Sequence, residues 1–385
     1  MELRGVRFDI DYFKKLNHRI EKELVKLEKD FCELTGKTNI NINSPDQISN
    51  YLFNELKLKS VKKTPKIQDS VDEESLLKLR EKYYNNMQIV CIIDVLHKYR
   101  EVSKIKNTYL DSFYRRLDLD GKFRTDFNQV GTVSGRFTAK PTLQTLPRNK
   151  NYNIRKLFIP EEGNTCIIAD YQQMELRLAA AISGDKVMFN ALKENKDLHE
   201  LTAKNIYKTE SPTKEQRYNA KQLNFAVLYG AMENQVARLT NQTKEESKQH
   251  IKSFYNLYKG FAEWKRKIEY QIEQTQKCKT PFGRTRNIDI SSIIPPWKQK
   301  RSMLNSIIQG AGADILKLSM VKIYENIEQK GLGFLLSTLH DELIVECKEE
   351  KKKEVFNIMK NCMEFTLKEM PLPVDIIYSK SFSKE

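Results

Sequence analysis

An apolar stretch near the C-terminal end, FLLSTLHDELIVEC at residues 334–347, is interrupted by His340-Asp341-Glu342 and then resumes. Two apolar runs separated by so short a polar segment predict two antiparallel strands joined by a tight turn. Acidic residues are common in turns, so a purely structural role remains open for this segment by itself. A catalytic role for Asp341 requires a second carboxylate close to it in the fold.

A second apolar run supplies such a carboxylate. Residues 166–169, Cys-Ile-Ile-Ala, form a short continuous apolar run typical of a buried strand, and Asp170 follows it directly. A helical pattern begins at Met174. If both strands belong to one sheet, Asp170 and Asp341 project side by side. Close carboxylates repel unless divalent cations lie between them, and hard oxygen ligands favour Mg²⁺. Two such ions form the clamp used in phosphoryl and nucleotidyl transfer.

The charge balance is consistent with phosphate chemistry. The 385 residues include 66 Lys and Arg against 51 Asp and Glu, a net charge of +15, which favours a polyanionic partner. Acidic membrane surfaces remain possible on charge alone. However, no apolar stretch approaches the ~20 residues of a spanning helix, and the N-terminus lacks the apolar core of a signal peptide. We therefore expect a soluble intracellular protein without a membrane partner.

The six cysteines are scattered, without a CxxC pair or zinc-ligand spacing, which predicts reduced thiols. They are Cys32, Cys91, Cys166, Cys278, Cys347 and Cys362.

A third segment, residues 211–230, predicts a helix that could bind a triphosphate. Thr213 marks its start and Gly230 its end. Two cations and then two aromatic residues recur every fourth position and share one face of this helix. They are Arg217, Lys221, Phe225 and Tyr229. The basic half of this stripe could neutralise a triphosphate and the aromatic half could stack on a base. A surface helix whose aromatic residues face the core is the alternative.

The N-terminal part is expected to be helical and basic. Residues 11–34 have amphipathic helical spacing, and Ser44 is a good N-cap before Pro45. Residues 57–70 contain five lysines and predict an exposed loop, either merely solvated or in contact with a phosphate backbone. Residues 73–116 return to a helical pattern, and the following Gly- and Pro-rich stretch predicts short strands and turns.

Several of these segments together resemble family A DNA polymerases of the bacterial DNA polymerase I type. DYQQMELRLAA around Asp170 resembles the first polymerase motif of the family, RYNAKQLNFAVLYG its fingers helix, and HDE its third motif. Further similar segments are SGRF, LQTLPRN, KDLHELTA, NSIIQGAGADILK, NSPDQISNYLF and KKTP. The resemblance extends over essentially the whole chain from Gly5 onward.

The resemblance implies an α+β right-hand polymerase fold with an antiparallel palm sheet, a helical thumb and helical fingers. The implied domains are a thumb at 1–116, whose N-terminal segment contacts the palm, a first palm part at 117–178, fingers at 179–300 and a second palm part at 301–385.

The resemblance also implies roles for the residues derived above. Asp170 and Asp341 would hold two Mg²⁺ ions with help from the Tyr171 carbonyl, and Mn²⁺ can substitute. Lys221 and Arg217 would grip the triphosphate. The primer 3′-hydroxyl would attack the α-phosphorus, and pyrophosphate would leave.

Other implied contacts are less central. Glu175 would exclude a ribose 2′-hydroxyl, Phe225 would disfavour dideoxynucleotides, and Tyr229 would stack near the templating base. The nucleotide-binding set is completed by His199 and Gln173. The implied DNA-binding residues are Arg136, Gln144, Arg301, Asn305, Gln309, His340, Lys104, Asn107, Lys62 and Lys63. Arg136 and Gln309 would reach the minor groove. Simple helix or turn packing is the alternative for each, and Glu342 has no derived role.

The sequence also departs from the family pattern. Gln172, Thr145, Tyr218 and Gly312 replace the usual Ser, Asn, Arg and Ala. No exonuclease segment is expected before Gly5, so the chain would be either a free-standing polymerase domain or a fragment of a longer protein. We expect a monomeric enzyme without 3′-5′ proofreading that acts on primer-template DNA and dNTPs. Separate proofreading or replisome proteins would then assist it in replication or repair. We expect it in the cytoplasm of a bacterial cell, at the nucleoid or encoded by a phage. Use of RNA templates and a non-catalytic DNA-binding paralogue are the alternatives.

Overall fold

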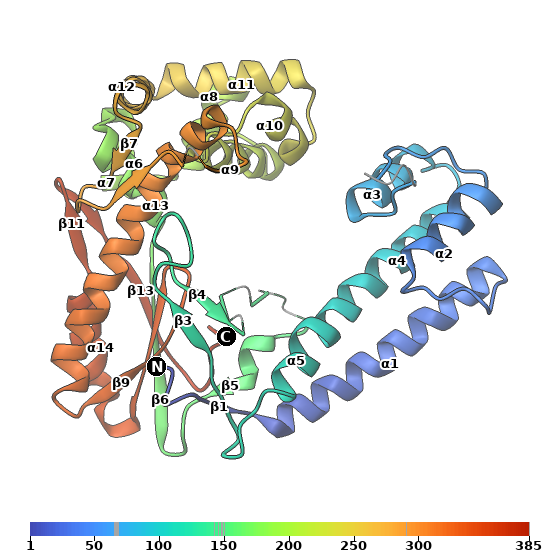
Figure 1. Ribbon diagram of the computed structural model, residues 1–385, viewed down its shortest axis with the longest axis horizontal. Coiled ribbons are helices and arrows are strands. Elements are labelled where there is room, and N and C mark those ends of the chain that lie inside the picture. Colours follow the sequence, from blue (N-terminus) through green and yellow to red (C-terminus); the bar gives the residue numbers. More distant parts are fainter. Residues whose placement is uncertain are drawn as a thin grey trace. The chain divides into compact units, whose positions relative to one another are not determined.

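The computed structural model describes residues 1–64, 69–141, 143–144, 146–147, 149, 151–289 and 291–384, with Trp297 by its backbone only. The chain divides into two compact units. Unit 1 comprises residues 1–6, 124–146 and 160–385, and unit 2 comprises residues 7–123 and 147–159 (Figure 1).

Unit 1 is built around a four-stranded antiparallel sheet with strand order β13-β6-β10-β9. Its strands are β6 (Asn164–Tyr171), β9 (Gly333–Leu339), β10 (Glu342–Lys348) and β13 (Val374–Ser379). The apolar runs recognised in the sequence are therefore neighbouring strands, β6 and β10. The expected hairpin is also present, because β9 and β10 pair and are joined at His340-Asp341.

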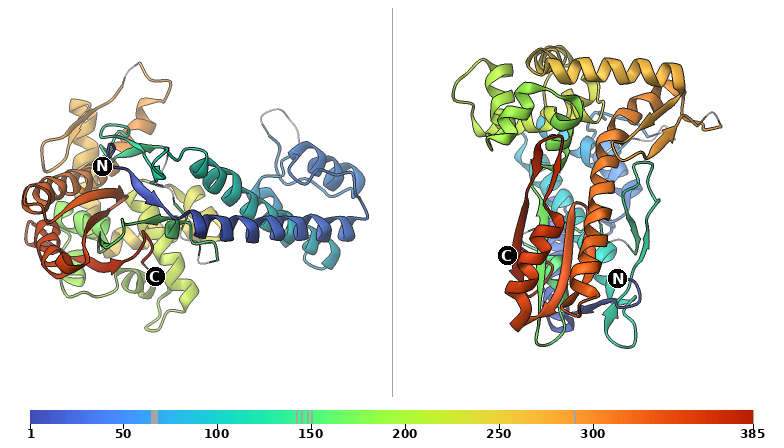
Figure 2. Two further views of the ribbon diagram at one scale, coloured as in Figure 1. Left: turned by 90° about the horizontal axis from the view of Figure 1, so that it is seen from below. Right: turned by 90° about the vertical axis from the view of Figure 1, so that its left-hand side faces the viewer.

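Helices cover one face of this sheet. Side chains alternate between faces along a strand, and Ile167, Ala169 and Tyr171 of β6 belong to the main hydrophobic core. α14 (Lys352–Met363) packs on β6, β10 and β13, while α13 (Pro296–Ile323) packs on α14 and α6 (Met174–Ser183) (Figure 2, right). Asp170 lies between Ala169 and Tyr171 along β6, so its side chain lies on the opposite face of the sheet.

Further helices of unit 1 follow α6 in the chain. They are α7 (Lys186–Lys193), α8 (Leu198–Tyr207), α9 (Lys214–Leu228), α10 (Glu233–Thr240), α11 (Lys244–Leu257) and α12 (Lys259–Thr275). α9 contacts both α8 and α10, which holds it in a fixed orientation. The expected helix at 211–230 is thus confirmed, with Thr213 as N-cap in a capping box with Gln216.

Short elements complete unit 1. They are β3 (Asp126–Asn128), β4 (Thr138–Lys140), β7 (Lys277–Lys279), β8 (Thr285–Asn287), η4 (Tyr324–Glu328), η5 (Glu349–Lys351), β11 (Phe365–Leu367) and β12 (Met370–Leu372). The pairs β3-β4, β7-β8 and β11-β12 are two-stranded antiparallel ribbons.

Unit 2 is mainly helical. It contains α1 (Ile10–Thr35), α2 (Pro45–Ser49), η1 (Asn50–Glu55), α3 (Glu73–Lys82), α4 (Met87–Lys104), η2 (Ile105–Leu110), α5 (Asp111–Tyr114) and η3 (Ile154–Leu157). α1 and α4 pack along each other (Figure 1). Strands β1 (Val6–Phe8), β2 (Lys122–Phe123) and β5 (Phe158–Ile159) form a small sheet with the order β2-β1-β5.

Several local expectations are confirmed. α1 buries the predicted apolar stripe, including Phe13, Leu16 and Ile20, and the Ser44 side chain caps α2 with Pro45 in its first turn. All six cysteines are free thiols. In the part of the chain that the structure describes, no helix is long and apolar enough to cross a membrane. The mixture of a helical majority with small antiparallel sheets confirms the α+β class.

Candidate functional site

Three carboxylates lie in a row across three neighbouring strands of the unit 1 sheet. Asp170 on β6 stands directly opposite Glu342 on β10 and opposite Asp375 on β13. Side chains of directly opposed residues share a face, so the three acids lie on the face away from the helical core. Like charges in this arrangement destabilise a sheet unless cations or hydrogen-bond donors compensate them.

Asp341 stands beside this row, in the turn between β9 and β10. The amide of Tyr171 donates to the Asp341 carbonyl at 3.4 Å, which joins the end of β6 to the turn. His340 has a φ of 55°, a left-handed conformation that reverses the chain. The expected juxtaposition of Asp170 and Asp341 is therefore present, and it depends on strand pairing between segments far apart in the chain.

Gln144 braces the same turn. Its Oε1 accepts a hydrogen bond from the His340 amide at 2.7 Å, and its Nε2 donates to the Thr338 carbonyl at 2.7 Å. Gln144 was expected to contact DNA. In this structure both ends of its amide are bonded to the hairpin that positions Asp341.

The electrostatic environment of Asp341 disfavours its ionised form. The pKa of Asp341 is raised to about 6: burial contributes most, Arg136 at 3.5 Å opposes the shift, and the nearby carboxylates of Glu175 and Asp170 add to it. About 30% of the side chain nevertheless remains exposed, so solvent and ligands reach it. A cavity of about 180 Å³ adjoins it, lined in part by Arg136, Gln144 and His340.

Two residues compensate the row of carboxylates, and neither was predicted from the sequence. The Lys384 ammonium lies 2.7 Å from Asp170 Oδ2 and 2.9 Å from Glu342 Oε2. Gln172 Nε2 donates to Asp375 Oδ1 at 2.6 Å. Gln172 replaces the Ser that the family usually has, so this departure has a structural consequence. The only sequence signal for Lys384 is a basic residue a few positions after an apolar strand, which is too common to be informative.

The carboxylates of this site suit a hard cation that takes only some of its ligands from the protein. No group of three or more His, Cys, Asp or Glu side chains with metal-binding geometry occurs among the described residues. Asp170 and Asp341 instead offer carboxylate oxygens at one partly exposed place. Mg²⁺ is usually held this way, by one or two carboxylates with water and substrate phosphates as the other ligands. The residues therefore fit such an ion.

Glu175, in the first turn of α6, is the centre of a polar cluster. Its Oε1 lies 2.5 Å from Arg136 Nη2 and accepts from Gln309 Nε2 at 3.5 Å, while its Oε2 accepts from the Tyr229 hydroxyl. Burial and the Glu175 charge raise the pKa of Tyr229, which keeps its hydroxyl protonated as a donor. This cluster connects the predicted minor-groove residues to the end of the α9 stripe.

The α9 stripe faces outward. Arg217, Lys221 and Tyr229 are exposed and Phe225 is half-buried, whereas the opposite face of the helix buries Ala220, Leu223, Asn224 and Val227. The alternative in which both aromatic residues face the core is therefore wrong. Their rings lie 6.3 Å apart at 27°, a nearly parallel pair.

Gly230 ends the stripe with a φ of +71° next to α13. A Cβ there would lie 3.1 Å from Arg301 Cγ and 3.2 Å from the Arg301 carbonyl oxygen, so both conformation and space favour glycine. Arg301, Asn305 and Gln309 follow one another along α13 at helical spacing, and all three are half-buried.

Arg217 already has a carboxylate partner. Its Nη2 lies 2.6 Å from Asp197 Oδ2. Asp197 also caps α8 by accepting from the His199 and Glu200 amides. Burial would raise the pKa of Asp197, but Arg217 and these amides outweigh it and lower the pKa. Among the described residues Lys221 makes no ion pair, so it is the more available cation of the two.

His199 is buried behind the stripe. The Asn224 amide nitrogen lies 3.0 Å from its Nδ1, and burial lowers the pKa of His199 to about 4, with Lys221 and Arg217 contributing. His199 is thus neutral at pH 7. The neutral, buried ring packs beside Phe225.

We expect this histidine to make the stability of the fold depend on pH. With a pKa near 4 when folded and 6.5 when unfolded, the unfolded chain binds more protons in that window. The free energy of unfolding should therefore fall by about 3 kcal/mol from this group as pH is lowered from 6.5 to 4. Urea denaturation across this range should show a weaker pH dependence for His199→Gln. Exposed His18→Gln is the control and should follow the wild type, and an equal slope for His199→Gln would contradict the assignment.

Gln173 begins α6 with a φ of 48° and is exposed. Its exposed position beside Asp170 and Glu175 in the chain leaves its side chain accessible to a ligand.

Three other residues depart from the family pattern. Tyr218, which replaces the usual Arg, is exposed on α9. A Cβ on Gly312 would make only ordinary contacts with Met174 and Leu178, so the usual Ala would fit. Thr145 lies outside the described residues.

Four predicted DNA-binding residues belong to unit 2. Lys104 and Asn107 are exposed and line a polar cavity of about 840 Å³, and Asn107 donates to Ser103 Oγ at 3.0 Å. Lys63 is exposed and bridges to Asp69 through the backbone.

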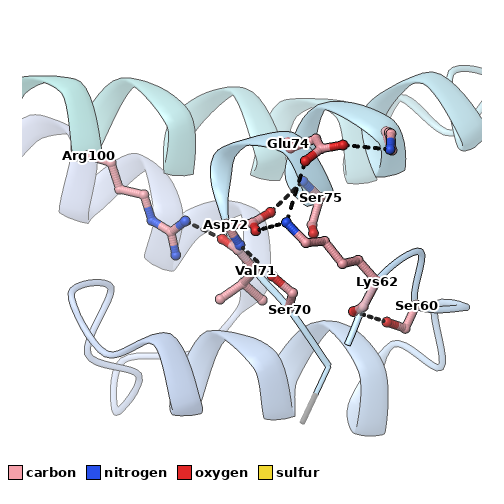
Figure 3. A network of polar contacts seen from close by, with 9 residues as sticks. Ser60, Lys62, Ser70, Val71, Asp72, Glu74, Ser75 and Arg100 are labelled. Carbon is pink, nitrogen blue, oxygen red and sulfur yellow. Dashed lines mark hydrogen bonds and ion pairs between the residues drawn. The ribbon is translucent and has the colours of Figure 1, made fainter. Parts of the chain in front are cut away.

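Lys62 is engaged within unit 2. Figure 3 shows its ammonium between Asp72 and Glu74, at 2.6 Å from Asp72 Oδ2 and 3.4 Å from Glu74 Oε2. The contact with Lys62 lowers the pKa of Asp72. The Ser70 amide donates to the Lys62 carbonyl at 2.9 Å, so this part of the basic loop is tied to the start of α3. Residues 65–68 of the loop, including the Pro of KKTP, lie outside the described residues.

Comparisons with known proteins agree with this geometry. Residues 10–384 match the sequence model of DNA polymerase family A. The chain is 34% identical to DNA polymerase I of Borreliella burgdorferi over 399 residues, covering 100% of this chain and 42% of that protein. It is also 34% identical to DNA polymerase I of Helicobacter pylori, covering 92% of this chain and 39% of that protein. The chain thus spans about two fifths of the length of these curated relatives.

A solved structure shares the fold. It is the POL domain of Pol1 from M. smegmatis in complex with DNA primer-template and dNTP, with a TM-score of 0.87 and 27% identity over 98% of this chain and 67% of that one. The right-hand polymerase fold expected from the sequence is therefore confirmed. Because the family match spans nearly all of its residues, this chain belongs to DNA polymerase family A.

Proposed function

We propose that the chain is a DNA-templated DNA polymerase that adds dNTPs to a primer 3′ end and releases pyrophosphate. The observation that carries this proposal is one connected set of contacts. Asp341 lies 3.5 Å from Arg136, Arg136 is paired with Glu175, and Glu175 accepts from Tyr229 at the end of the exposed α9 stripe. The proposed metal-binding carboxylate Asp341, the proposed minor-groove residue Arg136 and the proposed nucleotide-binding helix α9 are thus joined by one set of contacts.

The binding partners follow from the same site. The POL domain of M. smegmatis was solved with DNA primer-template and dNTP, which supports the same ligands here. Two bound divalent ions, Mg²⁺ or Mn²⁺, would supply charge neutralisation and acidification of the primer 3′-hydroxyl. For its part, the chain holds Asp170 and Asp341 together by strand pairing, and Tyr171 adds a backbone carbonyl at the end of β6.

The remaining residues orient the reactants. Lys221, exposed on α9, binds the triphosphate as a point charge. Arg217 also binds the triphosphate, after its guanidinium has exchanged the Asp197 carboxylate for phosphate oxygens. Glu175 occupies the position where a 2′-hydroxyl would go. His340 and Asn305 contact the primer and template near the turn and on α13. Most of the rate enhancement then comes from positioning and preorganised charge.

The domain names follow the same proposal. The helical unit 2 is assigned as the thumb, the four-stranded sheet as the palm, and helices α7–α12 as the fingers. In this assignment residues 117–178 and 301–385 make up the palm, with 179–300 as fingers. The first residues of the chain contact the palm through the Arg4–Glu328 ion pair at 3.1 Å.

Primer extension tests the proposal. We expect the 385-residue protein to extend a primed DNA template with dNTPs and Mg²⁺, to reject rNTPs, and to lose activity with EDTA. Matched DNA and RNA templates show whether RNA is also copied. A 3′-mismatched primer should not be trimmed, because the family match occupies residues 10–384 and is to the polymerase family. DNA binding without extension under all conditions would instead favour a non-catalytic paralogue.

A further inference from the structure

The segment after β13 folds back toward the carboxylate row. Phe382 and Ser383 are buried, Ser379 Oγ donates to the Ser383 carbonyl at 2.6 Å, and the Ser383 amide donates to Ser381 Oγ at 3.2 Å. These contacts give residues 379–383 a defined conformation. This packed segment therefore positions Lys384 at the sheet.

At the sheet, Lys384 bridges two acids with different surroundings. The Glu342 side chain is 1% exposed and cannot remain charged there without a partner, whereas 24% of the Asp170 side chain is exposed. The ammonium lies 2.7 Å from one oxygen of Asp170, Oδ2, and 2.9 Å from Glu342 Oε2. This contact gives Glu342, which had no role derived from the sequence, a specific one. It holds Lys384 in place.

The position of Lys384 has an electrostatic consequence. An ammonium at hydrogen-bond distance from Asp170 opposes a divalent cation at the same carboxylate, because like charges repel strongly at such distances. Two other charged groups face this place, Asp341 in the turn and Asp375 across β13, and Arg136 lies beside Asp341. Lys384 is in direct contact with Asp170.

We propose that Lys384 is an internal counter-cation that shares Asp170 with the divalent metal and weakens metal binding by the nucleotide-free protein. A positioning residue of this kind makes metal binding depend on the negative charge that an incoming triphosphate brings. The inference rests on the proposed function in one respect, the role of Asp170 as a metal ligand.

Mn²⁺ titration of the nucleotide-free protein, followed by electron paramagnetic resonance, tests the inference without any measurement of activity. Lys384→Met should bind Mn²⁺ about tenfold more tightly than the wild type, because a competing charge is lost. Lys384→Arg keeps the charge and should match the wild type within about twofold. Lys380→Met is the matched control, because Lys380 lies on the same segment but contacts the Asn164 carbonyl and Glu349.

A second pair of variants covers the case in which Lys384→Met leaves Glu342 unpaired and the fold suffers. Glu342→Gln and Glu342→Gln/Lys384→Met both lack that buried charge, and the double variant should again bind Mn²⁺ about tenfold more tightly than the single one.

Asp170→Asn separates the possible failures. If it weakens Mn²⁺ binding but removal of Lys384 leaves affinity unchanged or lower in both backgrounds, the counter-cation inference is overturned and the metal assignment stands. If Asp170→Asn has no effect on Mn²⁺ binding, both the metal assignment and the inference are overturned.

Discussion

Replacing Asp341 by alanine should lower the rate of primer extension by about a thousandfold, because loss of one of the two proposed metal ligands removes several kcal/mol of charge stabilisation. Asp170→Ala should have a similar effect. Asp341→Asn keeps the shape of the side chain but not its charge, and it should be almost as inactive. Single-turnover extension of a primed template with saturating dNTP measures the effect on chemistry.

Asp375→Asn is the matched control for this experiment. Asp375 stands opposite Asp170 on the same sheet face, but its carboxylate is bonded to Gln172. Its replacement should cost less than about tenfold, because the proposed metal ligands remain. Circular dichroism should show that all variants keep the fold. Robust extension by Asp170→Ala or Asp341→Ala would refute the assignment of these carboxylates.

The second large effect concerns the choice of sugar. Glu175→Ala should reduce discrimination against rNTPs by about a hundredfold, because it removes a nearly buried side chain that we propose fills the place of the 2′-hydroxyl. Discrimination is measured as the ratio of kcat/KM for a dNTP to that for the matching rNTP. The absolute rate should also fall, because Arg136 and Tyr229 lose their common acceptor.

Two variants separate bulk from charge at this position. Glu175→Gln keeps the volume and should retain most of the discrimination, although its contact with Arg136 is weaker without the charge. Tyr229→Phe removes one donor and leaves Glu175 held by Arg136, so discrimination should change only slightly. If Glu175→Ala discriminates as well as the wild type, another residue excludes the ribose.

Local features of this chain were predictable because they depend on neighbouring residues. The capped helix at Thr213, the buried strand before Asp170 and the turn at His340-Asp341 all follow from periodicity and from turn chemistry. The outward direction of the α9 stripe was not decided by its spacing, since either face of that helix could have met the core. Packing against α8 and α10 determines it.

Other predicted residues have partners that no motif reveals. Arg217 is paired with Asp197, Gln144 braces the Asp341 turn, and Lys62 is held by Asp72 and Glu74. These contacts join residues separated by 10 to 196 positions in the chain. A sequence pattern identifies the type of side chain at a position. It does not show which distant residue already forms an ion pair or hydrogen bond with that side chain.

The sequence by itself determined the family, the strand-turn-strand that carries Asp341, the strand that ends in Asp170 and the helix that presents Lys221, because motif spacing and short-range periodicity encode them. Only the tertiary structure placed Asp170 between Glu342 and Asp375 and brought Lys384 to that row. The physical reason is that strand register and the return of the segment after β13 depend on long-range packing. A lysine and a buried glutamate far apart in the chain become an ion pair only when the sheet has formed.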